Sequence, residues 1–266
     1  MYTYSLEHRE YLKRLKKEKI FVSFFRALVV FIFLILWEVL SRFNIINSFL
    51  SSSPTKVINT TISLINDGSL FKNIFVTLYE VIISFILSSL IGIFISIILW
   101  SKKVLYKIVD PYLTVLNSLP KVALGPLIII WVGASVNSII FMSLLISTFI
   151  TIINVYNGFI STNKSYITLL KSLRASKRQI FTKVVLPSNF PTIINALKIN
   201  ISMNLIGVIM GELLVSKKGL GYMIMYGSQV FNINLVITSV VILAIISYIM
   251  YFVVDKLEKK VSYRSN

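Results

Sequence analysis

Few side chains in this sequence are of the types that perform acid–base, nucleophilic or metal chemistry. The 266 residues include ten carboxylates, one histidine and no cysteine. His8 has no second metal ligand or nucleophile grouped around it. The patterns HExxH, GxSxG and GxxxxGK[ST], which mark zinc proteases, serine hydrolases and phosphate-binding loops, do not occur. We therefore expect no catalytic residue, no metal site and no cofactor in this chain, and no ATPase site of its own.

The residues best suited to line a solute pathway are polar or small and lie within long apolar runs. Asn200, Asn204, Gly207 and Gly211 follow one another at spacings of four, three and four, so they share one face of a helix. Such a stripe either packs closely against another membrane helix or forms the wall of a substrate route. We assign the following residues to a translocation pathway or dimer interface: Asn117, Ser118, Pro120, Asn200, Asn204, Gly207, Gly211 and Glu212.

Two prolines interrupt another apolar run. Pro120 and Pro126 free backbone carbonyl groups that can face a cavity, although a kink that only shapes the helix is the favoured interpretation. Asn117 and Ser118 come just before the break and are modest pathway candidates. Lys121 is expected to extend its ammonium group towards the membrane surface.

Two carboxylates lie near the ends of apolar runs. Glu80 and Glu212 are in reach, along the sequence, of Lys72, Lys217 and Lys218. We expect ion pairs between these groups rather than contact with a ligand.

The composition is that of a membrane protein. Hydrophobic residues make up 56%, charged residues only 14%, and the mean hydropathy is +0.83. Soluble domains carry about 25% charged residues. The net charge of +17 is therefore better explained by membrane topology than by nucleic-acid binding.

The apolar runs are long enough to cross a bilayer as helices, because backbone polar groups in lipid must be satisfied internally. The sequence predicts an all-α membrane protein with six transmembrane helices and a cytoplasmic helix pair between helices four and five. The domain boundaries are a tail at 1–20, a transmembrane domain at 21–254 and a second tail at 255–266. The predicted spans are 21–40, 74–100, 112–131, 138–160, 190–214 and 233–254.

Lysine and arginine are distributed unevenly between the two sides of these spans. Nineteen fall in the two tails, the loop 101–111 and the segment 161–189, whereas five fall on the opposite side. Cytoplasmic loops carry the excess of basic residues in membrane proteins. We expect a multi-pass protein of the cell membrane with both termini and the segment 161–189 in the cytoplasm.

The segment 161–189 has the spacing of two short amphipathic helices rather than that of a linker. Asn163 or Ser165 can cap the first helix, and Pro187 is expected to end the second. Three interpretations remain open for the pair. It lies on anionic lipid, it is only a topology signal, or it is a docking surface for a partner.

This segment resembles the coupling region of permease subunits in binding-protein-dependent ABC importers. That family's pattern is EAA, three residues, Gly, nine residues, Ile, one residue and Leu-Pro. Placing Leu-Pro on Leu186–Pro187 puts Val184 at the Ile position, Arg174 at the Gly position, and Thr168, Leu169 and Leu170 on the EAA triplet. The second half of the pattern matches and the first half is degenerate, so either the partner has an altered socket or a second permease couples more conventionally.

The resemblance implies which residues contact the partner ATPase. Leu170, Leu173, Ile180 and Phe181 would be the apolar contacts, and Arg174, Lys177 and Arg178 would be polar contacts at the rim. The full set assigned to ATPase coupling is Leu170, Leu173, Arg174, Ala175, Ser176, Ile180, Phe181, Val184, Leu186 and Pro187.

Three stretches are similar to the sulfonate, taurine and nitrate branch of these permeases, over roughly residues 70–255. They are "LNSLPKVALGPLIIIWVGAS", "LRASKRQIFTKVVLPSNFPTIINALK" and "GELLVSKKGLGYMI". The resemblance implies two ATP-binding subunits that carry ATP and magnesium, an extracytoplasmic substrate-binding protein and a second permease copy, with a homodimer favoured. The solute would be a small organic anion or a vitamin precursor.

Two other classes of function remain open. A stand-alone secondary transporter usually has more spans and internal repeats, and it needs no structured cytoplasmic helix pair. A membrane-bound enzyme would need a convergent set of acid, histidine or cysteine residues. A membrane assembly scaffold would not need such a set.

Overall fold

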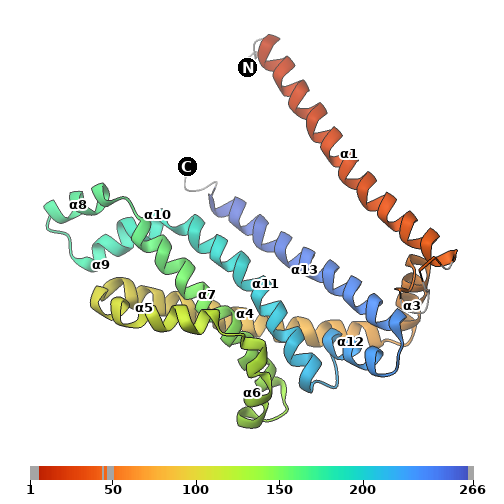
Figure 1. Cartoon of the computed structure of the whole chain (residues 1–266). Helices are drawn as coiled ribbons and strands as arrows, with labels where there is room; N and C mark the ends of the chain where they lie inside the picture. Colours follow the sequence, from red (N-terminus) through yellow and green to blue (C-terminus); the bar gives the residue numbers. More distant parts are fainter. Residues whose placement is uncertain (1–5, 44, 47–50, 263–266) are drawn as a thin grey trace. The chain divides into compact units, whose positions relative to one another are not determined.

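The computed structural model describes residues 6–43, 45–46 and 51–262, and within these ranges every regular element is a helix. The ends of the two predicted tails, residues 1–5 and 263–266, lie outside the described residues. Figure 1 shows the path of the chain through these helices. In chain order they are α1 (Leu6–Arg42), α3 (Pro54–Asn66), α4 (Ser69–Ser101), α5 (Lys103–Ser118), η1 (Lys121–Leu124), α6 (Gly125–Val132), α7 (Val136–Ser161), α8 (Lys164–Ser172), α9 (Lys177–Ile180), η2 (Phe181–Val185), α10 (Leu186–Ser188), α11 (Phe190–Val215), α12 (Leu220–Gln229) and α13 (Ile233–Ser262).

Five stretches are long and apolar enough to cross a membrane, and a sixth is added if a bent pair of helices counts as one span. The five are Arg14–Arg42, Ser69–Ser101, Val136–Ser161, Phe190–Val215 and Ile233–Lys256. They coincide with the first, second, fourth, fifth and sixth predicted spans, so the predicted all-α membrane fold is confirmed.

The predicted third span is not a single straight helix. Residues Lys103–Ser118 and Lys121–Val132 form two helical arms that meet at an angle of 84°. Leu119 is extended and Pro120 follows it at the break, which agrees with the restriction that a proline places on the preceding residue. The sequence signalled a kink at Pro120 but not its size, nor the start of the first arm at Lys103.

The helices also extend beyond the predicted span boundaries. Helix α1 begins at Leu6, so most of the predicted N-terminal tail is helical. Helix α13 continues to Ser262, past the predicted end of the transmembrane domain at residue 254.

The chain divides into two compact units, residues 1–63 and 64–266. In the first unit, hydrogen bonds join the end of α1 to the start of α3. Glu38 accepts hydrogen bonds from the Arg42 side chain (2.8 Å) and from the Thr55 N–H (3.0 Å). The Ser41 hydroxyl donates to the Ser52 carbonyl at 2.8 Å.

The second unit is organised around α11, which packs against α7, α4, α12 and α13. One apolar cluster at the α12 end of this bundle joins α4, α12 and α13 through Leu70, Leu220, Met223, Leu235, Ile242 and Ile246. The opposite end of α11 carries the segment 161–189. With a rise of about 1.5 Å per residue, a helix of 26 residues separates these two ends by about 39 Å.

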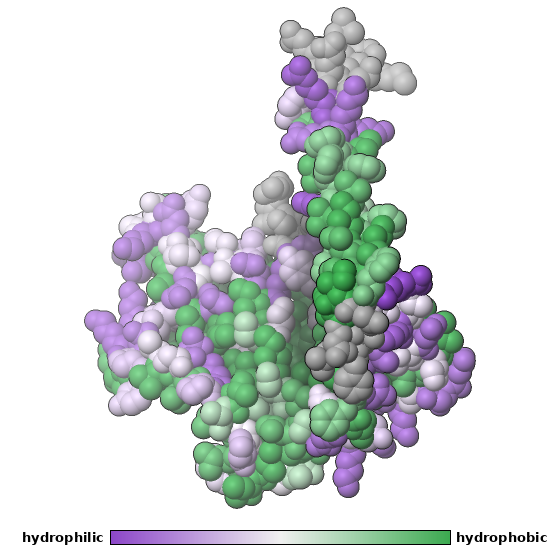
Figure 2. Space-filling view, turned by 45° about the vertical axis from the view of Figure 1, so that its right-hand side comes forward, coloured by the Kyte–Doolittle hydropathy of each residue, from purple (hydrophilic) through white to green (hydrophobic). Residues whose placement is uncertain are grey.

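The surface hydropathy agrees with membrane insertion. Figure 2 shows that the middle of α1 is covered by hydrophobic side chains and its outer end by hydrophilic ones. A broad hydrophobic surface also covers much of the visible face of the second unit, with hydrophilic side chains gathered towards its edges. Exposed apolar area on this scale is expected of helices that contact lipid.

Candidate functional site

The segment between α7 and α11 forms two short helices held by complete caps. The Asn163 side chain accepts the Ser165 N–H at 2.9 Å and so caps α8. Ser176 and Gln179 form a reciprocal capping box at the start of α9, with bonds of 2.7 Å and 3.3 Å. The predicted pair of short helices is therefore present, and of the two candidate caps for α8 the structure uses Asn163.

The turn between the two helices is a Schellman motif with Arg174 at its left-handed position. Arg174 has φ +57°. Its N–H donates to the Lys171 carbonyl at 2.9 Å, and the Ala175 N–H donates to the Leu170 carbonyl at 2.9 Å. The turn that glycine makes in the family's pattern is thus preserved, although the arginine side chain adopts this conformation at a steric cost of about 1–2 kcal/mol.

The second half of the segment contains a wide helical turn ahead of Pro187. Residues Phe181–Val185 form a π-helix, and the Leu186 N–H bonds to the Phe181 carbonyl. A proline ring clashes with the carbonyl of the residue four positions earlier in a regular helix, and a wider turn relieves that contact. Pro187 lies near the start of α10, which ends at Ser188, so the prediction that Pro187 ends the second helix is wrong.

The two ends of the segment are tied together by one buried side chain. Asn189, at the end of the segment, donates from its amide to the Thr162 hydroxyl at 2.7 Å and to the Val185 carbonyl at 2.8 Å. Asn189 and Thr162 are both buried. The segment is therefore a fixed structural element rather than a floating loop.

Two residues expected to contact a partner instead face the interior of the chain. Ile180 is only 5% exposed. The Phe181 ring packs on Trp100 and Phe159, with centroid distances of 5.0 Å and 5.3 Å. Ile180 fills the core beneath the segment, so the expectation that it is a surface contact is wrong. Phe181 is half-buried against the same core, and its role in coupling stays a prediction. Leu170, Ala175 and Leu186 also pack against this core.

A different apolar stripe faces outward on α8. Tyr166, Leu169 and Leu173 are 57%, 59% and 70% exposed. Their spacings of three and four place them on one face of the helix. Of the residues predicted for coupling, Leu173 belongs to this outward stripe, and Arg174, Ser176 and Pro187 are also exposed. Val184 is half-buried.

Basic side chains surround the outward stripe. The segment 161–189 contains six lysines and arginines and no carboxylate. All six are exposed, and none forms an ion pair with another described residue of the chain. They are Lys164, Lys171, Arg174, Lys177, Arg178 and Lys183.

The polar stripe of α11 makes a hydrogen-bonded network inside the second unit. Asn200 and Asn204 are fully buried. The Asn204 amide donates to the Ser88 hydroxyl of α4 at 3.0 Å, and its oxygen accepts from the Ser143 hydroxyl of α7 at 2.8 Å. The Asn200 amide donates to the Thr151 hydroxyl of α7, and its oxygen accepts from Ser88 at 3.0 Å.

The glycines of the same stripe allow α7 and α11 to approach closely. A Cβ atom on Gly207 would lie 2.5 Å from the Cα atom of Ser143, and one on Gly211 would lie 3.0 Å from the Cα atom of Ile139. These contacts are those of helix packing, one of the two interpretations of the stripe. The stripe faces other helices of its own chain, so a role in a pathway or dimer interface stays a prediction.

The other pathway candidates lie at the bend between α5 and η1. Asn117, Ser118 and Pro120 are exposed. Lys121 donates to the Asn117 side-chain oxygen at 3.2 Å, and its ammonium group lies 5.6 Å from the centroid of the Phe149 ring. The bend thus presents one cation beside an exposed amide.

Glu212, the last pathway candidate, holds a glycine-containing loop. It accepts hydrogen bonds from the Thr77 hydroxyl and the Gly221 N–H, both at 2.6 Å. Neither Glu212 nor Glu80 forms an ion pair within the described part of the chain, so the expected pairing with the lysines at 72, 217 and 218 is wrong. Those lysines are exposed, whereas both carboxyl groups are buried.

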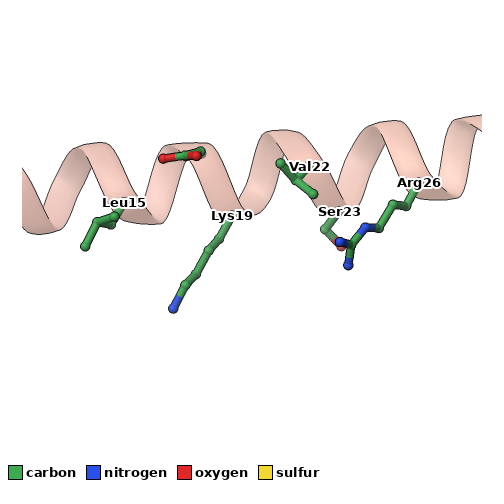
Figure 3. A pocket seen from close by; sticks show the side chains of 6 residues that line it. Leu15, Lys19, Val22, Ser23 and Arg26 are labelled. Carbon is green, nitrogen blue, oxygen red and sulfur yellow. The ribbon is translucent and has the colours of Figure 1, made fainter.

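A shallow groove also occurs on α1, in the first unit. Figure 3 shows that its lining side chains all come from this one helix. The lining residues are Leu15, Glu18, Lys19, Val22, Ser23 and Arg26.

Several residues of these sites were not singled out from the sequence. Tyr166 and Leu169 complete the outward stripe, and their helical spacing relative to Leu173 is the signal that could have identified them. Ser143, Ser147 and Thr151 recur every four residues and mark the face of α7 that receives the stripe of α11. No local pattern pointed to the pair Thr162 and Asn189.

Comparison with known proteins identifies the family. The formylaminopyrimidine transport permease protein ThiX of Halalkalibacterium halodurans is 29% identical over 225 residues, covering 85% of this chain and 89% of the relative. The putative aliphatic sulfonates transport permease protein SsuC of Bacillus subtilis is 28% identical over 225 residues, covering 85% and 82%. The nitrate import permease protein NrtB of Synechocystis is 26% identical over 207 residues, covering 74% of each chain.

The fold is shared with a solved transporter. A chain from the inward-facing structures of the MetNI methionine ABC transporter superposes with a TM-score of 0.64 at 22% identity, covering 71% of this chain and 94% of that one. The description of binding-protein-dependent transport system inner membrane components matches residues 88–263, which include the segment 161–189 and the loop held by Glu212. The chain belongs to this family of transport permease components.

Proposed function

We propose that the chain forms the membrane-spanning part of an ATP-driven importer, in which the segment 161–189 docks on an ATP-hydrolysing subunit. The observation that carries the proposal is the outward stripe of Tyr166, Leu169 and Leu173 on a helix that caps and core packing hold in place. A helix pair that only marked topology would need neither a fixed orientation nor exposed apolar side chains at its tip.

The charge of the segment indicates the chemistry of the partner surface. Six exposed cations without carboxylate partners in their own segment favour a socket that carries acidic residues. This would fit the degenerate EAA triplet, which carries no glutamate here. Anionic lipid would satisfy the cations but would not select among the three apolar residues of the stripe.

The proposed assembly contains two ATP-binding subunits, which supply ATP and magnesium, two copies of this chain and an extracytoplasmic binding protein. The distribution of nineteen against five basic residues supports an orientation with both termini and the segment 161–189 in the cytoplasm. Closure of the ATPases around ATP would move the docked segments and rock the permease halves between outward-open and inward-open states.

The proposed solute is a small organic anion or a vitamin precursor. The relatives are named for formylaminopyrimidine, aliphatic sulfonates and nitrate, all small polar solutes. In this chain, the bend at Asn117 and Lys121 provides a cation and an amide that suit an anion. Uptake of a labelled solute, competed with each of these three classes, would discriminate among them.

Copurification tests the proposal. The tagged chain, expressed with its neighbouring genes, should retain one ATP-binding subunit per permease copy and hydrolyse ATP in the complex. Leu169→Glu should abolish retention because it places a carboxylate within the apolar stripe, whereas Leu169→Met should preserve it. Full retention and uptake with Leu169→Glu would refute the docking role.

A further inference from the structure

Two buried carboxyl groups lie at the end of α11 opposite the segment 161–189. Glu80 of α4 and Glu212 of α11 are 0% and 1% exposed. Each is the other's electrostatic neighbour. The proposed ATPase coupling uses neither group.

The two carboxyl groups have different surroundings. Glu212 is supplied with donors, because the Thr77 hydroxyl and the Gly221 N–H each donate to one of its oxygens. Its carboxylate also lies at the N-terminus of α12, where the helix dipole favours a negative charge. By contrast, no backbone or hydroxyl donor of the described chain reaches either buried oxygen of Glu80, whose hydrogen-bonding neighbour is the carboxyl group of Glu212.

Among the described residues of the second unit, no cation compensates a second negative charge at this place. Helices α7 and α12 contain no charged residue, and the first charge on α13 is Asp255, near its far end. Lys72 of α4 and the loop residues Lys217 and Lys218 are exposed and bond to neither carboxyl group. Lys198, the other charge on α11, pairs with Asp255. A buried carboxyl group without donor or cation holds its proton.

The carboxyl pair is also the anchor of a loop. Three consecutive N–H groups bind to α4 and α11: Gly219 to the Asn73 oxygen (2.7 Å), Leu220 to the Thr77 hydroxyl (2.8 Å) and Gly221 to Glu212. Gly219 has φ +105°, and a Cβ atom there would lie 2.2 Å from a Glu212 oxygen. The loop can close over the carboxylate only because this residue is glycine.

We propose that Glu80 and Glu212 form a buried binding site for one proton, and that this proton keeps the loop 216–221 closed on α4. The proton resides on Glu80 and lets its neutral carboxylic acid lie against the Glu212 carboxylate. When the proton leaves to water, two negative charges face each other in apolar surroundings. Their repulsion separates α4 from the end of α11 and opens the loop. The location of this loop on the side of the membrane from which solute arrives rests on the proposed function, whereas the proton site does not.

Because the chain has no cysteine, the loop can be probed by single-cysteine labelling. Leu220→Cys reports opening, since Leu220 is fully buried in the closed loop, and Lys218→Cys is the matched exposed control. The full chain in membrane vesicles is labelled with a membrane-impermeant thiol reagent from about pH 5 to about pH 9. The rate at Leu220→Cys is divided by the rate at Lys218→Cys, which removes the pH dependence of the thiol itself.

The proposal predicts that this ratio rises with pH, by up to about tenfold per unit below the pKa of the closed carboxyl pair, and levels off above that pKa. Glu80→Gln should keep the ratio low throughout, because an amide is neutral at every pH. Glu212→Gln should keep it high, because an amide nitrogen opposes the donors of the loop. Met223→Cys, at a second buried position of α12, provides an independent reporter if Leu220→Cys fails to fold.

Three results would overturn the proposal. A flat ratio in the otherwise unmodified chain would exclude proton-controlled opening. An equal rise in Glu80→Gln would place the titrating group elsewhere. Closure that follows sodium concentration rather than pH, on replacement of sodium by choline, would make the site one for a metal cation. Each reading is independent of uptake, so it also holds if the proposed transport function fails.

Discussion

A glycine at position 174 should stabilise the turn that ends α8 more than an alanine does. Arg174 occupies the left-handed region at φ +57°, which disfavours a side-chain-bearing residue by about 1–2 kcal/mol. Glycine removes that strain but gains freedom in the opened state, which offsets about 0.5–1 kcal/mol. Both Arg174→Gly and Arg174→Ala lose the cation near the helix C-terminus, so the expected net gain of glycine over alanine is about 0.5–1 kcal/mol, equivalent to a two- to fivefold shift in the local opening equilibrium.

Amide hydrogen exchange measures this opening directly. The N–H groups of Arg174 and Ala175 close the turn, and α8, with nine residues, is too short to persist without its caps and packing. A peptide that covers residues 169–176 should therefore exchange about two- to fivefold more slowly in Arg174→Gly than in Arg174→Ala.

Arg174→Ala is the matched control, because it removes the guanidinium group and keeps the Cβ atom in the strained conformation. It should exchange at least as fast as the natural chain, since a cation at a helix C-terminus is itself stabilising. Equal exchange in the glycine and alanine variants would refute the assignment of strain to this residue.

Further predictions concern the buried network, the helix approach, the segment clamp and the bend. Asn204→Leu removes a side chain that bonds to α4, α7 and its own helix, so at about 0.6 kcal/mol per bond the free energy of unfolding should fall by about 2–3 kcal/mol. The thermal unfolding midpoint in detergent should be lower, and an unchanged midpoint would contradict the network. Gly207→Val should prevent folding, because its side chain would overlap the backbone of Ser143, and normal monodisperse yield would count against the close approach. Asn189→Leu should speed proteolysis within 161–189 without unfolding the spans; undiminished resistance would remove the clamp. Lys121→Gln should lower uptake of an anionic solute more than Lys121→Arg does, whereas equal effects would remove Lys121 from solute recognition.

Features that depend on long apolar runs and their flanking charges were accessible from the sequence. Backbone polar groups in lipid must be satisfied internally, which requires helices, so five spans were predicted in the right places, although the helices extend beyond the predicted limits. The sequence predicted one cap of the segment 161–189, because Asn163 lies directly before an amphipathic run. The position of Arg174 in the turn followed from the family's pattern, and the structure adds its left-handed conformation.

Features that depend on which side of a short helix meets the core were not accessible. The sequence does not distinguish the exposed from the buried apolar residues of this segment. Trp100 and other residues beneath the segment pack against Ile180 and Phe181 and leave Leu169 and Leu173 exposed. The partners of Glu212 include Thr77, which is 135 residues away, so the sequence suggested nearby lysines instead. Pro120 likewise indicated where the helix breaks but not the angle of 84° between its two arms.

The most direct test of the docking surface is site-specific cross-linking from two positions in the same segment. Leu173→Cys places a thiol on the outward stripe, and Ile180→Cys places one in the core, in a chain that otherwise lacks cysteine. Carrying a photoactivatable thiol-linked probe, the Leu173 variant should cross-link to the ATP-binding subunit in membranes, and the Ile180 variant should not. Cross-linking from Leu173 to lipid alone, or to the ATP-binding subunit from Ile180 and not from Leu173, would contradict docking through this surface.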